Sequence, residues 1–327
     1  MKAAWYERNG SAREVLTIGE MPTPSPGPGE VRVKIACSGL NPSDVKRREG
    51  SRGQAIEFPR VIPNSDGAGT VDAVGPGVSE AWKGKRAWVW NAQWGRAFGT
   101  CAEYCCLPEA QVAPLPDSVE FSAGACLGIP AMTAHQALFS DGDVRGKTIL
   151  VTGGAGAVGY YAIQMAKWAG ARVAATVSSD EKAKLAKAAG ADLVINYKSE
   201  DVAKKALEFS PGGVDRVVEV DFGGNLETNI KALRLNGAIA SYASMGNPEP
   251  KIPFYTLMRR GIAVDLVFVY MMKPEERAKA LADLAVLLKE NRLKHNVAKH
   301  FKLDQLVAAH ELQESNRVVG NIVIDLA

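Results

Sequence analysis

Residues 148–159 read TILVTGGAGAVG, and this stretch is the strongest indication of the fold class in the chain. The apolar run at 148–152 is typical of a buried strand, and residues 160–169 have the pattern of a helix that Gly170 ends. Between them, residues 154–159 carry the spacing GxGxxG at the entry to the helix. A glycine turn between a strand and a helix is the context that the dinucleotide-binding fingerprint requires.

The chemistry of this turn favours a pyrophosphate ligand. Glycines permit a tight turn and let the backbone approach the phosphates, while the helix N-terminus offers free N–H groups and positive potential. The alternative is that the glycines serve only to form a tight turn between strand and helix and bind no ligand. The predicted cofactor-binding residues here are Gly154, Ala155, Gly156, Ala157, Val158 and Gly159.

Strands and helices alternate after this unit, whereas the chain before it is rich in β-strand. Predicted strands follow at 172–177, 192–196, 215–220, 238–243 and 263–270, with helices at 180–189, 225–235 and 274–291. This alternation predicts an α/β fold with a doubly wound parallel sheet. Residues 1–125 contain short β-rich runs between glycine and proline clusters, at 31–36, 69–74, 87–90 and 104–107, and predict a barrel-like β domain.

The end of the second strand, TVSSDEK at 176–182, distinguishes between the nicotinamide cofactors. An NAD site usually has an acid at this strand tip to bind the ribose hydroxyls. Here Ser178, Ser179 and Lys182 stand instead, and Ser178 with Lys182 can meet a 2′-phosphate, which favours NADPH. The alternatives are a helix cap for Ser179, with Asp180 as a first-turn acid, and a solvated helix face for Lys182.

Length and composition indicate the number of domains and the general class of protein. The 327 residues suggest about two domains, and the 46% hydrophobic and 23% charged residues exclude a disordered chain. The net charge of +3 is too small to imply a polyanionic partner. The five cysteines form no CxxC pair. Without a membrane-length apolar run or a signal-like start, we expect a cytoplasmic protein and no membrane partner.

Several further segments carry a family resemblance over essentially the whole chain. They are GLNPSD at 39–44, NSDGAGTVDAVGPGV at 64–78, GTCAEYCCLP at 99–108, GIPAMTAHQAL at 128–138 and AGADLVINY at 189–197. Together with VTGGAGAVG they resemble the medium-chain dehydrogenase/reductase superfamily, and within it the zinc-free quinone oxidoreductases of the zeta-crystallin type.

The resemblance implies two domains. One is a GroES-like catalytic domain made of residues 1–126 and completed by 268–327, and the other is a Rossmann NADP(H)-binding domain at 127–267. It also implies an active site in the cleft between them, and a homodimer or homotetramer joined along the strand near 263–266.

The resemblance further implies chemistry without zinc or flavin. Superfamily members that bind catalytic zinc use a Cys and a His where this chain has Asn41 and Ser65, and the four-cysteine lobe is missing. Without a Lewis acid, the expected reaction is transfer of a hydride or electrons from NADPH to a quinone or similar activated carbonyl. Lys46 and Arg52 replace tyrosines of the family, which predicts a more basic pocket and an acidic or polar acceptor.

Two residues are the predicted catalytic groups, and both are also assigned to the cofactor. Asn41 can donate a hydrogen bond to a substrate carbonyl, and its alternative is an Asx turn before Pro42. Thr133 matches the family threonine near the nicotinamide, and its alternative is helix packing.

The remaining site predictions have structural alternatives too. The aromatic cluster before the GTCAEY segment is expected to line the substrate pocket, with core packing as the alternative, and consists of Trp90, Trp94 and Phe98. Tyr197 is expected near the adenine or the 2′-phosphate, unless it is a simple strand-end aromatic. Ser244 and Met245 are expected at the nicotinamide ribose, Phe268 at the carboxamide, and Arg317 at the cofactor unless it caps the terminal strand.

Two other functions stay open. The first is reduction of an alkenal or enone double bond by NADPH. The second is RNA binding through the basic run at 289–302, for which a solvated helix end is the alternative, so a nucleic acid is not the expected partner.

Overall fold

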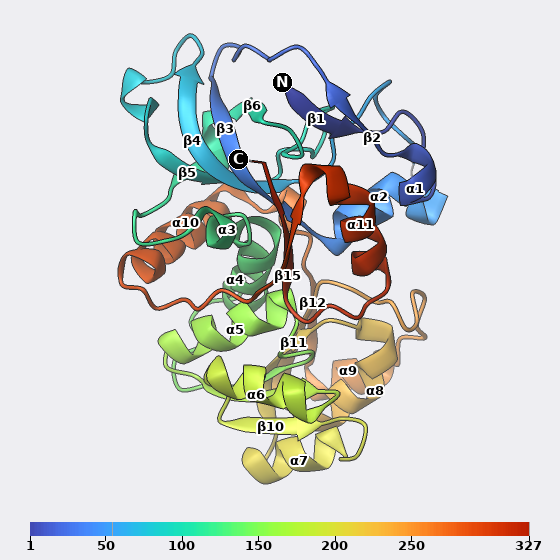
Figure 1. Ribbon diagram of the computed structural model, residues 1–327. Coiled ribbons are helices and arrows are strands. Elements are labelled where there is room, and N and C mark those ends of the chain that lie inside the picture. Colours follow the sequence, from blue (N-terminus) through green and yellow to red (C-terminus); the bar gives the residue numbers. More distant parts are fainter. Residues whose placement is uncertain (54, 327) are drawn as a thin grey trace. The chain divides into compact units, whose positions relative to one another are not determined.

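The structure is a computed structural model that describes residues 1–53 and 55–326 (Figure 1). Two compact units make up the chain. Unit 1 comprises Met1–Ile129, Leu284–Asn291 and His295–Ala327, and unit 2 comprises Pro130–Asp283 and Arg292–Lys294. Helix α10 (Pro274–Lys289) contributes residues to both units.

Unit 2 contains a six-stranded parallel sheet in the order β10-β9-β8-β11-β12-β13. Its strands are β8 (Thr148–Val151), β9 (Arg172–Val177), β10 (Leu193–Asn196), β11 (Val214–Glu219), β12 (Leu233–Ser241) and β13 (Ala263–Leu266). Its helices are α4 (Met132–Phe139), α5 (Ala157–Trp168), α6 (Asp180–Ala188), α7 (Val202–Phe209), α8 (Phe222–Ala232) and α9 (Phe254–Arg260). The strand order reverses direction between β8 and β11, which is the signature of a doubly wound Rossmann sheet. The predicted α/β class is confirmed.

The sheet strands form where the sequence allows burial on both faces. All four residues of β8 are buried, and Ile149 pairs with Val173 of β9 on one side and with Arg216 of β11 on the other. Central parallel strands are covered on both faces, so they consist of continuous apolar runs. This is why the sequence alone located β8 and β9.

Several element boundaries differ from the predictions, and helix α7 was not predicted. Helix α5 begins at Ala157, a turn earlier than predicted, because the glycine turn leads directly into it. Helix α8 ends at Ala232 and not at residue 235, because the buried Leu233 pairs with Val214 as the first residue of β12. Strand β13 ends at Leu266, where its last partner on β12 is Ser241.

Unit 1 is built around a seven-stranded sheet in the order β14-β15-β3-β4-β5-β7, with β6 also pairing with β3. The strands are β3 (Glu30–Leu40), β4 (Asp66–Val74), β5 (Arg86–Val89), β6 (Tyr104–Pro108), β7 (Val112–Pro114), β14 (Val297–Lys302) and β15 (Asn321–Asp325), with a separate β1 (Lys2–Trp5) and β2 (Thr17–Glu20) pair. The helices are α1 (Ala12–Val15), α2 (Pro42–Glu49), α3 (Phe121–Gly124) and α11 (Leu306–Glu314). Because Ile322 of β15 pairs antiparallel with Leu40 of β3, the C-terminal strands belong to the first sheet.

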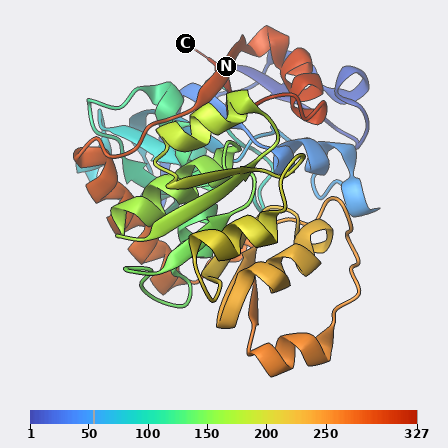
Figure 2. The ribbon, with the colours of Figure 1, turned by 90° about the horizontal axis from the view of Figure 1, so that it is seen from below.

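One part of unit 2 leaves apolar side chains in solvent. Helix α9 follows a long connection from β12 and stands away from the other helices of the unit (Figure 2). Phe254 and Tyr255 of α9 are both more than 60% exposed, and Leu266 of the edge strand β13 is 72% exposed. Exposed apolar surface on a sheet edge is typical of an interaction site.

Candidate functional site

The turn between β8 and α5 has the geometry of a dinucleotide cradle. Gly153 has a φ of 64°, and its N–H donates to the hydroxyl of Thr176 at 3.1 Å. A Cβ on Gly159 would lie 2.4 Å from the carbonyl oxygen of Gly153. Gly156 is the N-cap of α5 and has no side chain, so the first-turn N–H groups are open to an anion. These residues fit the pyrophosphate of a dinucleotide.

The predicted phosphate-selecting residues lie together at the carboxyl ends of β9 and β10. The Lys182 ammonium donates to the Ser178 hydroxyl at 3.0 Å. The N–H of Tyr197 donates to the carbonyl of Val177 at 3.1 Å, which brings Tyr197 beside Ser178 with 53% of its surface exposed. Ser179 caps α6 by accepting from the Lys182 N–H at 3.3 Å, as its alternative interpretation predicts. The group therefore offers a hydroxyl, an ammonium and an aromatic ring to one ligand.

The other predicted cofactor residues of unit 2 follow β12 and β13. The Ser244 hydroxyl accepts from the Gly223 N–H at 2.9 Å and donates to the Asn247 carbonyl at 2.6 Å, so it holds the loop after β12. Met245 and Phe268 are each about half exposed. The residues predicted after β8, β9, β10, β12 and β13 thus share the carboxyl edge of one sheet, where open parallel sheets bind ligands.

In unit 1, Asn41 belongs to a buried polar cluster. It is 4% exposed, it is the N-cap of α2, and its N–H donates to Asp44 Oδ2 at 2.8 Å. Its amide Nδ2 donates to Asp66 Oδ2 at 2.7 Å, and the same oxygen accepts from the Ile129 N–H at 2.8 Å. Burial raises the pKa of Asp44 to about 7 and that of Asp66 well above its usual range, with the charge of Asp44 adding to the shift of Asp66.

The three predicted aromatic residues have three different environments. Trp90 is 1% exposed and its ring lies 5.1 Å from that of Trp88, an arrangement that favours the core-packing alternative. Trp94 lies under the guanidinium of Arg47, at 4.9 Å from its carbon to the ring centre. Phe98 lines a separate cavity with Tyr104 and Cys106 among its other residues. The expected aromatic lining of the substrate pocket stays a prediction.

Comparison with known proteins identifies the family. The zinc-binding dehydrogenase family matches residues 157–286, and the alcohol dehydrogenase GroES-like domain matches residues 27–117. The quinone oxidoreductase of Pseudomonas aeruginosa is 31% identical over 322 residues, 95% of each chain. The chain belongs to the quinone oxidoreductase family of the medium-chain dehydrogenase/reductase superfamily. The predicted family and the GroES-like and Rossmann fold class are confirmed.

Other members of this superfamily differ in cofactor and substrate. A mycobacterial protein solved with NADPH is 30% identical, with a TM-score of 0.87 over 100% of both chains. A structure named NAD-dependent alcohol dehydrogenase is also 30% identical, with a TM-score of 0.88 over 100% of both chains. The 2-haloacrylate reductase of a Burkholderia species is 28% identical over 93% of each chain. The neighbour solved with NADPH supports NADPH as the cofactor, whereas the relatives' different substrates leave the acceptor open. The chain's own residues carry the finer argument.

The metal position of this quinone oxidoreductase family member does not fit zinc. The amide of Asn41 and the hydroxyl of Ser65 are not ordinary zinc ligands, and the Asn41 amide is already bonded to Asp66. Within residues 1–53 and 55–326, no three His, Cys, Asp or Glu side chains are grouped so that they could hold a metal ion.

Thr133 and Arg317 belong to different units of the chain. Thr133 is in the first turn of α4 in unit 2 and is 4% exposed. Arg317 is in unit 1, exposed in the turn between α11 and β15, and its N–H donates to the Ser315 hydroxyl at 3.3 Å. The side chain of Arg52 is outside the described part of the structure.

Sequence reasoning missed Glu219, the last residue of β11. Its carboxylate is fully buried beside the glycine turn. It accepts hydrogen bonds from the Thr152 hydroxyl at 2.9 Å, the Asn225 amide at 2.9 Å and the Asn229 amide at 2.6 Å. Glu219 thereby ties β8 to α8 at the point where the strand order reverses. An acid that ends an apolar run, here VVE, is the signal that could have found it.

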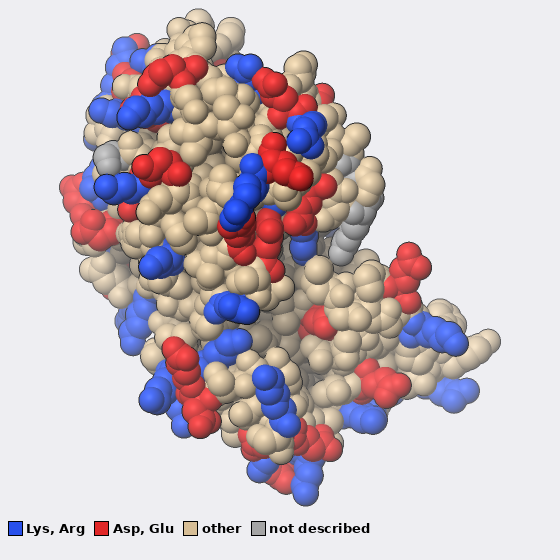
Figure 3. All heavy atoms as spheres, turned by 45° about the vertical axis from the view of Figure 1, so that its right-hand side comes forward, with Lys and Arg blue, Asp and Glu red and all other residues tan. Residues whose placement is uncertain are grey.

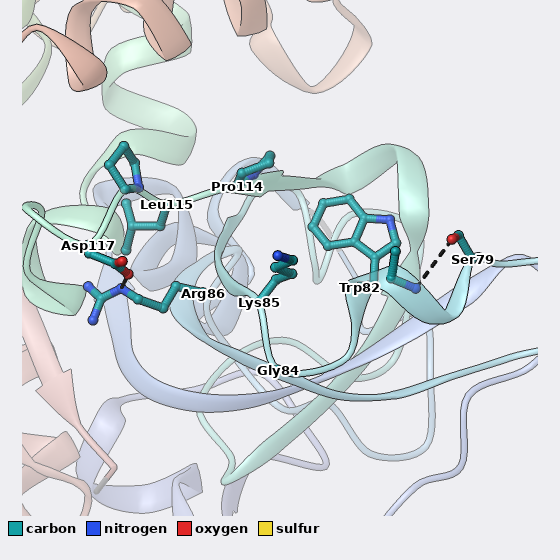
Figure 4. Close-up of a pocket in the computed structure, with 10 residues that line it drawn as sticks. Ser79, Trp82, Gly84, Lys85, Arg86, Pro114, Leu115 and Asp117 are labelled. Carbon is teal, nitrogen blue, oxygen red and sulfur yellow. Dashed lines mark hydrogen bonds and ion pairs between the residues drawn. The ribbon is translucent and has the colours of Figure 1, made fainter.

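An open cavity of about 670 Å³ lies elsewhere in unit 1 (Figure 4). Trp82, Lys85, Pro114 and Leu115 are among the residues that line it, and none of the predicted site residues does. On the face drawn in Figure 3, acidic and basic side chains are intermixed, so that face lacks the basic stripe that nucleic-acid binding requires. Among the helices of residues 1–53 and 55–326, none is long and apolar enough to cross a membrane.

Proposed function

We propose that this quinone oxidoreductase family member is an NADPH-dependent reductase that transfers a hydride to a quinone or a similarly activated carbonyl, without zinc. The observation that carries the proposal is the Ser178–Lys182 pair at the end of β9, with its 3.0 Å hydrogen bond. A cation and a hydroxyl at this position suit a 2′-phosphate, whereas NAD sites usually place a carboxylate there. The open N–H groups of α5 would hold the pyrophosphate.

The bound cofactor supplies the hydride, and the chain supplies its position and surroundings. Without a Lewis acid at Asn41, nothing in the donor set stabilises an alkoxide strongly, so an acceptor that takes electrons readily is favoured. A quinone meets this condition. One N–H of the Asn41 amide is bonded to Asp66, and its second N–H is the group that would donate to the acceptor carbonyl.

A second candidate is reduction of an activated carbon–carbon double bond. The relative named 2-haloacrylate reductase favours it, because a haloacrylate is such an acceptor. Both reactions use the same hydride and the same polarisation of a carbonyl oxygen. They differ in product, which is a hydroquinone in one case and a saturated carbonyl compound in the other.

The experiment that tests the function is NADPH oxidation against a panel of quinones, enones, aldehydes and nitroaromatics, with NADH run in parallel. We expect quinones to be reduced and NADPH to be preferred. Saturated products from enones, with quinones left unreduced, would select the second candidate. No oxidation with any member of the panel would contradict the proposal.

We further propose that two copies join through the exposed edge of β13 in unit 2. Val264 and Leu266 of this strand are 39% and 72% exposed, and unpaired strand edges bind further strands. The double change Val264→Lys and Leu266→Asp should therefore yield monomers in sedimentation analysis while the wild type sediments as a dimer or tetramer. A wild-type monomer would contradict this part of the proposal.

A further inference from the structure

Two consecutive arginines in the last turn of α2 have opposite surroundings. Arg48 is fully buried, pairs with the carboxylate of Glu314 and donates to the carbonyl of Gly10. Arg47 is half-buried, and Nη1 donates only to Gln93, at 2.6 Å to Oε1 and 2.8 Å to the main-chain oxygen. Within the described residues Arg47 has no carboxylate partner, so its charge is not neutralised by direct contact.

Arg47 is nevertheless held in place. Gln93 is 4% exposed, and its Nε2 donates to the Arg96 carbonyl at 3.1 Å, which fixes Oε1 toward Arg47. The guanidinium also stacks over Trp94 at 4.9 Å, a cation–π contact that restricts it further. Nε and Nη2 of Arg47 donate no hydrogen bond within the described residues. These two atoms form the edge of a guanidinium that binds a carboxylate through two parallel hydrogen bonds.

The nearest acid on the same helix does not fill this role. Asp44 lies one turn earlier, is fully buried, and accepts hydrogen bonds from the main-chain N–H groups of Asn41 and Ser65. Burial raises its pKa to about 7, so its negative charge is incomplete at neutral pH. The charge of Arg47 lowers the pKa of Asp44, but burial has the larger effect and raises it. A fixed cation that forms no ion pair within the described residues and leaves one edge of its guanidinium open is the arrangement that recognises an anionic ligand.

We propose that Arg47 is a specificity-determining residue and that the acceptor reduced by this protein carries a carboxylate, which binds the Nε–Nη2 edge of Arg47. The inference rests on the proposed function for the reaction itself and adds the substrate class. A lysine could supply the charge without the planar fork, so arginine is the better residue here. The positive charge also predicts that the KM for an anionic acceptor rises with ionic strength.

The test compares a neutral and an anionic acceptor, 1,4-naphthoquinone and 1,4-naphthoquinone-2-carboxylate, in wild type and Arg47→Gln. The ratio of kcat/KM for the carboxylate over the neutral quinone should fall about 10- to 100-fold in the variant, the size expected for loss of a charge-assisted hydrogen bond. Arg47→Lys should lose less. Arg13→Gln, a change at an arginine that is 79% exposed in the same unit, should leave the ratio as in the wild type. An unchanged ratio in a folded Arg47→Gln protein overturns the inference.

A binding measurement separates this inference from the proposed function. If the wild type reduces neither quinone, the proposed function fails, and titration calorimetry with 2-naphthoate then decides the question for Arg47. We expect binding to the wild type and a dissociation constant at least tenfold higher in Arg47→Gln. Equal binding by the two proteins, or no binding by the wild type, would refute the anion site.

Discussion

At the carboxyl edge of the sheet in unit 2, the groups offered to a ligand come mostly from one continuous stretch, residues 153–182. Around Asn41 in unit 1, the corresponding groups come from α2, β4 and the segment that ends at Ile129. The first region is made of backbone N–H groups, glycines and short hydroxyls. The second is made of two buried carboxyl groups, Asp44 and Asp66, that accept hydrogen bonds from Asn41 and Ile129.

The two regions should therefore respond differently to substitution. The glycine cradle depends on the absence of side chains, and its ligand-binding groups remain open. The Asn41 cluster depends on the presence of polar partners, and one Asp66 oxygen serves two donors at once. We therefore expect changes in the Asn41 cluster to cost mainly stability, and changes in the cradle to cost mainly cofactor affinity.

The largest effect should come from Asp66→Leu. The change leaves the Asn41 amide and the Ile129 N–H buried without their acceptor, and each unpaired buried donor costs about 1–3 kcal/mol. We predict a loss of about 2–6 kcal/mol in the free energy of unfolding, measured by urea denaturation. Asp66→Asn keeps an acceptor oxygen and is the matched control. Equal stability of the leucine and asparagine variants would show that the two hydrogen bonds do not hold this region together.

The next effect is a pH dependence that belongs to the Asn41 cluster. Burial raises the pKa of Asp44 to about 7, whereas an unfolded aspartate has a pKa of about 3.9. The folded protein binds this proton more tightly, so the free energy of unfolding should fall as pH rises from about 4 to 7, by up to ~1.4 kcal/mol per pH unit.

Unfolding measured across that pH range checks this prediction. Asp44→Asn should flatten the curve, because asparagine has no proton to lose, and the exposed Asp304→Asn should not. A wild-type curve that rises between pH 4 and 7, with no change in slope in Asp44→Asn, would contradict the assignment.

A smaller loss of stability is expected when either of two glycines in the cradle is changed to alanine, and the loss should differ between the two. A Cβ on Gly159 would lie 2.4 Å from the Gly153 carbonyl oxygen, whereas one on Gly156 would lie 3.3 Å from the same oxygen. Gly159→Ala should lower the free energy of unfolding by about 1–3 kcal/mol through overpacking, and Gly156→Ala by less. Both should weaken NADPH binding in a fluorescence titration, because Gly156 faces the expected pyrophosphate. If Gly156→Ala binds NADPH as tightly as the wild type does, the turn between β8 and α5 is not the pyrophosphate site.

The same contrast explains what the sequence could reveal. Buried strands such as β8, the GxGxxG spacing and Lys182 are local patterns, and a hydrogen bond between residues 178 and 182 spans one helical turn. The bonds of Asp66 join residues 25 and 63 positions apart, and no local pattern announces such pairs. Trp90 and Phe98 are close in sequence, but one is buried and the other lies 40% exposed, because neighbouring loop residues need not face the same way.

The boundaries that sequence analysis misplaced have the same cause. Leu233 and Leu235 continue a helical pattern, yet pairing with β11 draws Leu233 into a strand. Glu219 was overlooked because its role is visible only from its partners, Thr152 directly after β8 and Asn229 on α8. Tertiary contacts determine both the end of α8 and the role of Glu219, and a local sequence pattern does not contain them.

We expect the residues at the carboxyl end of β9 to select the 2′-phosphate of NADPH. Titration calorimetry of wild type, Lys182→Glu and Lys184→Glu with NADPH and NADH tests this selection, with the exposed Lys184 on the same helix as the control. We predict that the wild type prefers NADPH, that Lys182→Glu reduces this preference about 10- to 100-fold, and that Lys184→Glu leaves it unchanged. A preference for NADPH that survives Lys182→Glu intact, or a wild type that binds NADH as tightly, would contradict the claim.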